Sequence, residues 1–411
     1  MTTKINNEHK KVYVPNLRFP EFHGEWEKCK LGDYGKVVTG NTPPTKDIEN
    51  YENGTYLWAS PADLGTIKSI TETKTMLSAQ GFSKTRTLPK GSVLVTCIGS
   101  TIGKAGMATK EMSTNQQINS IVVNDNNDNE FVYYAIQSAF PRYLSSIAVQ
   151  AVPIISKSAF ELLPNNRPYL QEQKKIGRFL SMLDERIATQ NKIIDKLQSL
   201  IKGLEDNLLD NPLWEKTYLR SFMQFFSTNS LSWEQLSYEE GEIRNLHYGL
   251  IHGFQTRGIN SASLPMIKNE AVPKQYISCQ VGDVAFADAS EDTGEIAKSV
   301  EFVDTIEGDT ICGLHTIHGR DIKNRTVVGF KGFAFNSRYF HNQIKRLAQG
   351  TKVFSITANN LSSCYVYLPD LETQKAIVKL LKAYEAQLIV SRKTLKQYEK
   401  QKQYLLRQMF I

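Results

Sequence analysis

The stretch CIGSTIGKAG at residues 97–106 is the first place in this sequence where residue types and spacing suggest chemistry. A glycine followed by Gly-Lys is typical of loops that bind nucleotide phosphates, but such a loop has four residues between them and a Ser or Thr after the lysine. Here three residues separate Gly99 from Gly103, and Ala105 follows Lys104. We therefore expect a strand that runs into a glycine turn, without a nucleotide site.

Other enzyme signatures are also incomplete. The run at residues 41–44, Asn-Thr-Pro-Pro, lacks the Asn-Pro-Pro-aromatic order that positions an amino group for methylation. Glu372 and Lys375 are one residue too far apart for a nuclease carboxylate–lysine set. His315 and His318 could bind a metal only with further ligands, and no neighbouring Cys or Glu pattern supplies them. We predict that the chain is not itself an enzyme and carries no metal or cofactor.

The elements that position these residues occur twice along the chain, as an internal repeat. The matching pairs are WEKCKL (26–31) with WEKTYL (214–219), GSVLVT (91–96) with GDVAFA (282–287), and PYLQEQKKI (168–176) with PDLETQKAI (369–377). Their offsets rise in order from 188 through 191 to 201, as insertions in the second copy would produce. The same alignment places Glu295 opposite Lys104.

The repeat divides the chain into two globular domains, residues 1–167 and 212–368, each followed by a helical segment, residues 168–211 and 369–411. Apolar residues in the helical segments recur in steps of three and four, which is the heptad pattern of a coiled coil. The predicted seam consists of Ile176, Leu180, Leu183, Ile187, Ile194, Leu197, Ile201, Leu204, Ile377, Leu381, Tyr384, Leu388, Leu395, Tyr398 and Leu405. Because a globular domain lies between the two helices, antiparallel pairing is favoured.

Short β-type runs such as SVLVTCI and DVAFADA predict strands in both globular domains. YYAIQSAFPRYLSSIA predicts a helix that is broken at Pro141. The expected fold is α+β, with two globular domains separated by two long helices in an antiparallel coiled coil and related by an internal pseudo-two-fold repeat.

Bulk composition limits the cellular setting. The net charge is +7, which permits a polyanionic partner without requiring one. Five scattered cysteines, the lack of an apolar run of membrane-spanning length and an N-terminus without an apolar signal core predict a cytoplasmic protein with reduced thiols.

Taken together, these features resemble a known family. Two unlike globular domains alternate with two like helices that open on P-x-L-x-x-Q-K-x-I. With FPEFHGEWEKCKLGDYGKVVTGNTP, LPKGSVLVTCIGSTIGKAG and SLSWEQLSYEEGEIRNLHYGLIH, residues 17–411 resemble the DNA-specificity subunit of bacterial type I restriction–modification enzymes.

The resemblance implies that each globular domain is a target-recognition domain that reads one half of a split DNA sequence. The coiled coil would set the separation of the half-sites and dock two modification (methyltransferase) subunits. S-adenosylmethionine, ATP and Mg²⁺ would then belong to those subunits and to the restriction (translocase and nuclease) subunits. Because the two domains differ in sequence, the target should be asymmetric. The alternative is a coiled-coil scaffold that carries two interaction modules for partners other than DNA.

The candidate DNA contacts are polar residues in segments between strands, where base-reading side chains are common. In the first domain they are Gly40, Asn41, Thr42, Ser60, Asp63, Lys104, Asn115, Gln116 and Gln117. In the second domain they are His247, Tyr248, His252, Thr256, Arg257 and Arg338. Arg257 is expected to reach a guanine through two hydrogen bonds, and Lys104 to touch a phosphate.

Overall fold

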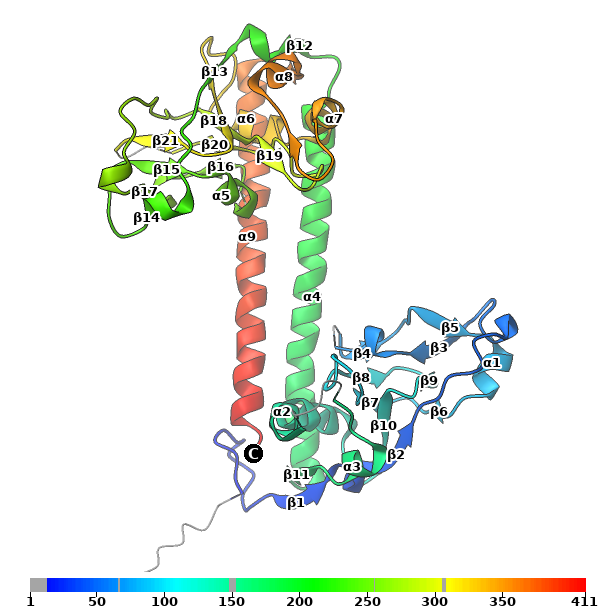
Figure 1. Cartoon of the computed structure of the whole chain (residues 1–411). Helices are drawn as coiled ribbons and strands as arrows, with labels where there is room; N and C mark the ends of the chain where they lie inside the picture. Colours follow the sequence, from blue (N-terminus) through cyan, green and yellow to red (C-terminus); the bar gives the residue numbers. More distant parts are fainter. Residues whose placement is uncertain (1–12, 66, 148–152, 255, 305–307) are drawn as a thin grey trace, which may run out of the picture. The chain divides into compact units, whose positions relative to one another are not determined.

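The structure is a computed structural model that describes residues 13–65, 67–147, 153–254, 256–304 and 308–411. The chain folds as two compact units, Met1–Asn191 with Thr394–Ile411, and Lys192–Lys393. Each unit contains one globular domain and one part of each of the two long helices, α4 and α9 (Figure 1).

Helix α4 spans Leu170–Leu209 and helix α9 spans Leu371–Gln408. Each begins shortly after the proline of its repeated motif, and Glu172 and Glu372 lie in the first turns, where carboxylates suit the positive end of the helix dipole. Helix α4 ends before Asn211-Pro212, because a proline disfavours helical geometry at the preceding residue.

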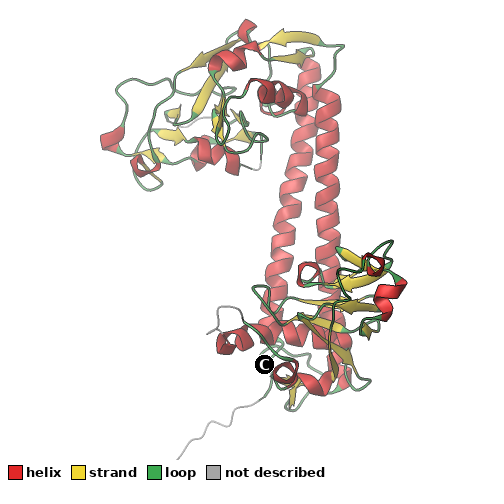
Figure 2. Ribbon diagram, turned by 45° about the vertical axis from the view of Figure 1, so that its right-hand side comes forward, coloured by secondary structure: helices red, strands yellow, loops and turns green. Residues whose placement is uncertain are grey.

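The two helices pack against each other within each unit (Figure 2). In the first unit, Leu180 near the start of α4 shares a core with Leu405 near the end of α9, and Lys402 Nζ lies 2.7 Å from Asp184 Oδ1. In the second unit, the end of α4 shares a core with the start of α9. This order is antiparallel, so the predicted coiled coil is confirmed.

Every predicted seam residue is buried or half-buried. Those below a tenth exposed are Ile176, Leu180, Leu183, Ile194, Leu197, Ile201, Ile377, Leu381 and Leu405. The half-buried ones are Ile187, Leu204, Tyr384, Leu388, Leu395 and Tyr398. The second helix therefore places larger and more polar side chains at the seam and excludes water less completely.

The globular domain of the first unit contains two main sheets. One has the strand order β2-β10-β7-β8-β4 and the other β5-β3-β9-β6, while β1 pairs with β11. The strands are β1 (Glu27–Lys30), β2 (Gly35–Thr39), β3 (Tyr56–Ala59), β4 (Ser69–Ile70), β5 (Thr75–Leu77), β6 (Thr87–Leu88), β7 (Val93–Thr96), β8 (Ala105–Ala108), β9 (Met112–Thr114), β10 (Ile118–Val123) and β11 (Pro164–Arg167). The helices are α1 (Ala79–Ser83), α2 (Asn129–Ile147) and α3 (Lys157–Glu161).

Helix α2 runs without interruption through Pro141, so the predicted break is wrong. Proline removes one backbone hydrogen bond and costs about 3 kcal/mol in a helix interior. Here Phe131, Tyr134 and Phe140 lie on the same helix and are buried in the core of the first unit. Burying each such side chain contributes about 1.5–3 kcal/mol, so the apolar face of α2 outweighs the penalty.

The globular domain of the second unit repeats this plan. Its five-stranded sheet has the order β13-β22-β18-β20-β16, its four-stranded sheet the order β14-β17-β15-β21, and β12 pairs with β24. The strands are β12 (Glu215–Tyr218), β13 (Met223–Phe226), β14 (Leu236–Ser237), β15 (Arg244–Leu246), β16 (Gly258–Ile259), β17 (Met266–Ile267), β18 (Val284–Ala287), β19 (Ala289–Ser290), β20 (Ser299–Phe302), β21 (Thr310–Cys312), β22 (Thr316–Asp321), β23 (Phe354–Ser355) and β24 (Tyr365–Leu368). The helices are α5 (Tyr248–Gly253), α6 (Phe330–Ala334), α7 (Arg338–Leu347) and α8 (Ala358–Ser363).

The two five-stranded sheets match strand for strand. Ile118 of β10 faces Thr96 of β7, and Thr316 of β22 faces Ala287 of β18, both in antiparallel register. At each outer edge, β4 joins β8 and β16 joins β20 in parallel. The internal repeat predicted from short sequence matches is therefore a repeat of topology.

Candidate nucleic-acid interface

The turn between β7 and β8 holds the glycine–lysine stretch. Gly99 and Gly103 have φ of 94° and 91°, a region that favours glycine, and a side chain at Gly103 would collide with Phe140. The turn joins two antiparallel strands, as expected for a strand that runs into a glycine turn. Lys104 is exposed and its side chain lies over Gly65, so it can contact an anion at the surface.

The matching turn of the second domain presents a different charge. Glu295 is half-buried between β18 and β20, with Oε2 2.9 Å from Lys298 Nζ and 3.3 Å from His252 Nδ1. Burial alone would raise the pKa of Glu295, but hydrogen bonds from Lys298 and His252, with their positive charges, outweigh it and lower this pKa. One domain therefore offers an exposed lysine here, and the other offers a paired carboxylate.

Three of the predicted contact segments of the first domain meet at the ends of strands β3, β7 and β9. The backbone bonds that join them run from Asn41 N–H to Thr114 O, from Asn115 N–H to Ala59 O and from Cys97 N–H to Gln117 O. Thr42 Oγ1 also hydrogen-bonds Gln116 Oε1. Segments distant in the sequence thus form one continuous surface region.

Most of the predicted side chains in this region already have partners. Asn41 accepts from the Arg86 backbone N–H and donates to the Lys84 carbonyl, both within 2.9 Å. Asp63 accepts from both Ser60 N–H and Ser60 Oγ at 2.8 Å. These residues shape the loops, and a base contact would have to replace or share existing hydrogen bonds.

Gly40 and Asn115 are placed differently from the role predicted for them. Gly40 is buried, and a side chain there would lie 2.2 Å from the Thr114 carbonyl oxygen, so this glycine permits close backbone approach. Asn115 is 8% exposed, and its amide both donates to and accepts from Gln117. The geometry favours structural roles for both, and leaves Gln116 and Lys104 as the exposed members of the predicted set.

Sequence reasoning missed two basic residues beside this region. Arg86 is exposed, and its Nη1 donates to the Thr39 carbonyl at 2.8 Å, while Lys84 pairs with Asp47 and Asn50. The run SKTRTLPKG, just before β7, was the signal that could have found them.

In the second domain, an array of aromatic rings surrounds the predicted residues His247 and Tyr248. The His247 ring lies 4.5 Å from Trp233 and 4.7 Å from Tyr248, and Tyr248 lies 5.3 Å from His315, measured between ring centroids. Trp233 is 46% exposed and was not predicted. Aromatic side chains at the surface can make apolar contacts with base edges in a DNA groove, so this array is a candidate for base contact.

His247 itself has a structural task, because it precedes α5. Its Nδ1 accepts a hydrogen bond from Gly249 N–H at 3.2 Å, and the ring is 3% exposed. Burial lowers the pKa of His247, which keeps Nδ1 free to accept. Trp233 and His315 are therefore the exposed members of the array, and Tyr248 is half-buried between His247 and His315.

Arg257 does not stand free as a guanine reader. Its Nη2 lies 3.8 Å from Glu205 Oε1 on α4, and its backbone N–H donates to Glu385 Oε1 on α9 at 3.3 Å. Burial raises the pKa of Glu205, and it raises the pKa of Glu385 to about 7, against the opposing charge of Arg257. The guanidinium lies beside Glu205, and the backbone of the same residue is bonded to Glu385, which favours a role in fixing the domain on the helices.

Three of the residues predicted in the second domain line one hollow of the second unit. Arg257, Arg338 and His252 line it together with Lys202 and Arg392 of the helices. Arg338 is exposed at the start of α7, and Thr256 is half-buried with Oγ1 bonded to the Gly258 carbonyl at 2.7 Å. Of these, Arg338 has the exposure that a DNA contact needs.

His315 and His318 do not share a site. His315 is exposed and pairs with Asp288 at 3.1 Å, whereas His318 is buried and pairs with Asp283 at 2.7 Å. The metal site considered for the His-x-x-His spacing is therefore not formed by these two residues together.

Comparison with known proteins fits this arrangement of two similar frameworks with unlike surfaces. The family model for the type I restriction modification DNA specificity domain matches residues 23–199 and 268–400. The chain belongs to this family. Both the predicted family and the fold that it implies are confirmed.

Two curated relatives and one solved structure illustrate the similarity. The type I restriction enzyme MjaVIII specificity subunit of Methanocaldococcus jannaschii is 25% identical, over 94% of either chain. The HindI specificity subunit of Haemophilus influenzae is 28% identical over 43% of this chain and 40% of its own. The crystal structure of a type I restriction–modification system S subunit from M. genitalium covers 97% of this chain and 99% of its own with a TM-score of 0.61, at 16% identity.

This type I specificity protein shares its fold with the solved S subunit. None of the helices in the described part of the chain combines the length and apolar character that crossing a bilayer requires.

Proposed function

We propose that this chain is the DNA-reading subunit of a type I restriction–modification complex, and that each globular domain reads one half of a bipartite, asymmetric target. The main support is that the two globular domains share one strand order but expose different side chains at matching places. The first domain presents Lys104, Gln116 and Arg86, and the second presents Trp233 with Tyr248. Two unlike reading surfaces on one framework predict two unlike half-sites.

The helices are proposed to set the half-site separation and to dock two methyltransferase subunits. Outside the seam they expose large apolar side chains, namely Met182, Ile193, Leu200, Leu380, Val390 and Tyr404, each at least 40% exposed. Exposed apolar groups in such number are typical of protein interfaces. S-adenosylmethionine, ATP and Mg²⁺ are assigned to the partner subunits, and the assembled complex to the bacterial cytoplasm.

The decisive experiment is methylome sequencing of a host that expresses the chain with its modification subunit. We expect one bipartite, asymmetric motif, methylated on both strands. Arg86→Ala should relax the half-site read by the first domain alone, and Trp233→Ala the half-site read by the second alone. Each variant serves as the control for the other, because both leave the helices unchanged.

Two outcomes would contradict the proposal. The absence of any sequence-specific methylation would favour a scaffold with two interaction modules for partners other than DNA. Methyl transfer or ATP hydrolysis by the purified chain without partners would show that the subunit is itself catalytic.

A further inference from the structure

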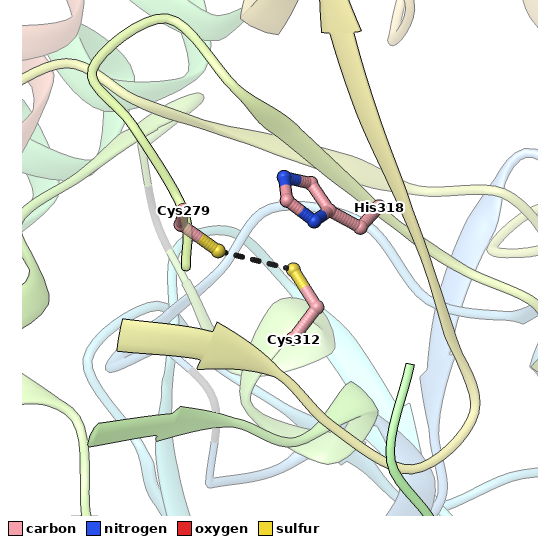
Figure 3. Close-up of side chains that lie close together, drawn as sticks. All are labelled: Cys279, Cys312 and His318. Carbon is pink, nitrogen blue, oxygen red and sulfur yellow. Dashed lines mark hydrogen bonds between the residues drawn. The ribbon is translucent and has the colours of Figure 1, made fainter. Parts of the chain in front are cut away.

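Two cysteines and a histidine of the second domain point toward one another in its interior (Figure 3). Cys279 Sγ and Cys312 Sγ are 3.5 Å apart, and these sulfurs and one ring nitrogen of His318 all lie within 4.8 Å of one another. None of the three residues is more than 5% exposed. Three metal-ligating atoms therefore converge in a closed space, outside the surfaces proposed to read DNA.

Asp283 orients the His318 ring through a hydrogen bond. Its Oδ2 lies 2.7 Å from His318 Nε2, and the same carboxylate accepts two hydrogen bonds from Arg320, at 2.7 and 2.8 Å. Because a carboxylate bound by an arginine is ionised and can only accept, Nε2 donates in this hydrogen bond, and Nδ1 is the ring nitrogen left to face a metal. Histidines that bind metals through one nitrogen commonly donate the other N–H to a carboxylate in this way.

We propose that Cys279, Cys312 and His318 bind one zinc ion, with Asp283 as the residue that orients the histidine. Thiolate and imidazole are the ligands that Zn²⁺ prefers, whereas Mg²⁺ and Ca²⁺ prefer oxygen. Two sulfurs each about 2.3 Å from a tetrahedral zinc are about 3.8 Å apart, close to the separation found here. Two thiolates also neutralise the ion, so the buried site has no net charge.

The fourth ligand of the ion is a water molecule in this proposal. Thr310 precedes Cys312 by two residues on β21, so both side chains lie on the same face of the strand. The Thr310 hydroxyl is fully buried and finds no hydrogen-bond partner among the described residues. A zinc-bound water on this face would give the hydroxyl a partner.

The site would join the two sheets of the second domain. Cys312 lies on β21 of the four-stranded sheet, and His318 lies on β22 of the five-stranded sheet. Cys279 precedes β18, and its backbone N–H donates to the Thr310 carbonyl at 2.7 Å. A bound ion would thus cross-link three segments that hold the framework of this domain.

The first domain lacks the ligands at the matching places. Matching β9 with β21 and β10 with β22 puts Thr114 opposite Cys312 and Ser120 opposite His318, while Leu88 stands opposite Cys279. None of these three can supply a thiolate or an imidazole. The expected stoichiometry is therefore one ion per chain, although the framework occurs twice.

The test uses the reduced, metal-free full chain titrated with Co²⁺ and, separately, with Zn²⁺. Cobalt bound by two thiolates gives a sulfur-to-metal charge-transfer band, which we expect to saturate at one ion per chain and to disappear when zinc is added. Cys312→Ser should weaken binding at least tenfold, and Asp283→Asn about 10- to 100-fold, because the histidine loses its orienting partner. Cys364→Ser is the matched control, since Cys364 is also buried in the second unit but outside the cluster.

The wild-type titration decides the matter even if a variant fails to fold. A wild-type chain that shows no thiolate-to-cobalt band would overturn the proposal, as would a disulfide between Cys279 and Cys312 in protein purified under reducing conditions. Equal loss of binding in Cys364→Ser and Cys312→Ser would also overturn it, because the signal would then not come from this cluster.

Discussion

Gln173 and Gln374 occupy the same position of the repeated motif, and each donates two hydrogen bonds and accepts one. Gln173 Nε2 donates to the Pro168 carbonyl and to Asn127 Oδ1, and its Oε1 accepts from the Asp128 N–H. Gln374 Nε2 donates to the Pro369 and Arg325 carbonyls, and its Oε1 accepts from the Val327 N–H. Each glutamine thereby ties the first turn of a long helix to its globular domain.

Gln374 should be intolerant of substitution, because it is fully buried. Gln374→Glu keeps the shape but replaces the two N–H donors with an acceptor that faces two carbonyl oxygens. We expect a loss of about 2–4 kcal/mol in the free energy of unfolding, measured by urea denaturation. Gln403→Ala, at an exposed position of the same helix, should change it by less than about 0.5 kcal/mol. Equal stability of Gln374→Glu and the wild type would refute the tethering role.

The coiled-coil seam should not tolerate a buried charge. Leu180 is fully buried in the core shared by α4 and α9, so Leu180→Asp should cost at least about 4 kcal/mol and abolish methylation in the host. Ala188→Asp is the control, because Ala188 is exposed on the same helix and lies outside the seam and outside the apolar set proposed to dock partners. If Leu180→Asp still supported methylation, the seam would not be required for docking.

Lys104 should contribute to DNA affinity without choosing the sequence. Lys104→Ala in the assembled complex should weaken binding to all targets by a similar factor and reduce the salt dependence by about one counterion. Lys110→Ala is the matched control, because Lys110 is exposed at the opposite end of β8. A changed methylation motif in the Lys104 variant would instead assign this lysine to base reading.

The repeat and the long helices could be predicted because their signals are local. Heptad spacing and motifs such as P-x-L-x-x-Q-K-x-I are visible in short windows of sequence. The role of Gln173 was not predictable in that way, since its partners Asn127 and Asp128 lie on a loop of the globular domain. Helix α2 shows the reverse case, where a local rule about Pro141 fails because the tertiary core holds the helix together.

The candidate site was less predictable, because exposure and pairing are set by contacts between distant segments. The sequence predicted Arg257 as a residue available to DNA, but its partners Glu205 and Glu385 lie on two helices that are distant from it in the sequence. Likewise, Cys279 and Cys312 have none of the close spacings that mark metal motifs, and only the meeting of two sheets brings them together. In both cases the residue types pointed to possible contacts, but the sequence alone did not indicate which residues lie next to each other in the fold.

The carboxylates around Arg257 should make the second unit sensitive to pH. Burial raises the pKa of Glu385 to about 7, and Glu205 adds to this rise, although Arg257 and Lys382 oppose it. Between roughly pH 4.3, where a free glutamate titrates, and pH 7, the folded chain keeps a proton that the unfolded chain releases. Stability should therefore fall as pH rises through this window.

Glu385→Gln removes that titration while keeping an oxygen to accept the Arg257 N–H. We expect the variant to match the wild type near pH 4.5 and to be about 1–3 kcal/mol more stable at pH 8, measured by urea denaturation at both values. Glu399→Gln, at an exposed position of the same helix, should follow the wild-type pH dependence. The opposite result is that Glu385→Gln shows the same pH dependence of stability as the wild type. Glu385 would then not titrate in this window, because Arg257 would keep it ionised. That would require a closer contact with the guanidinium than the 3.8 Å found between Arg257 and Glu205.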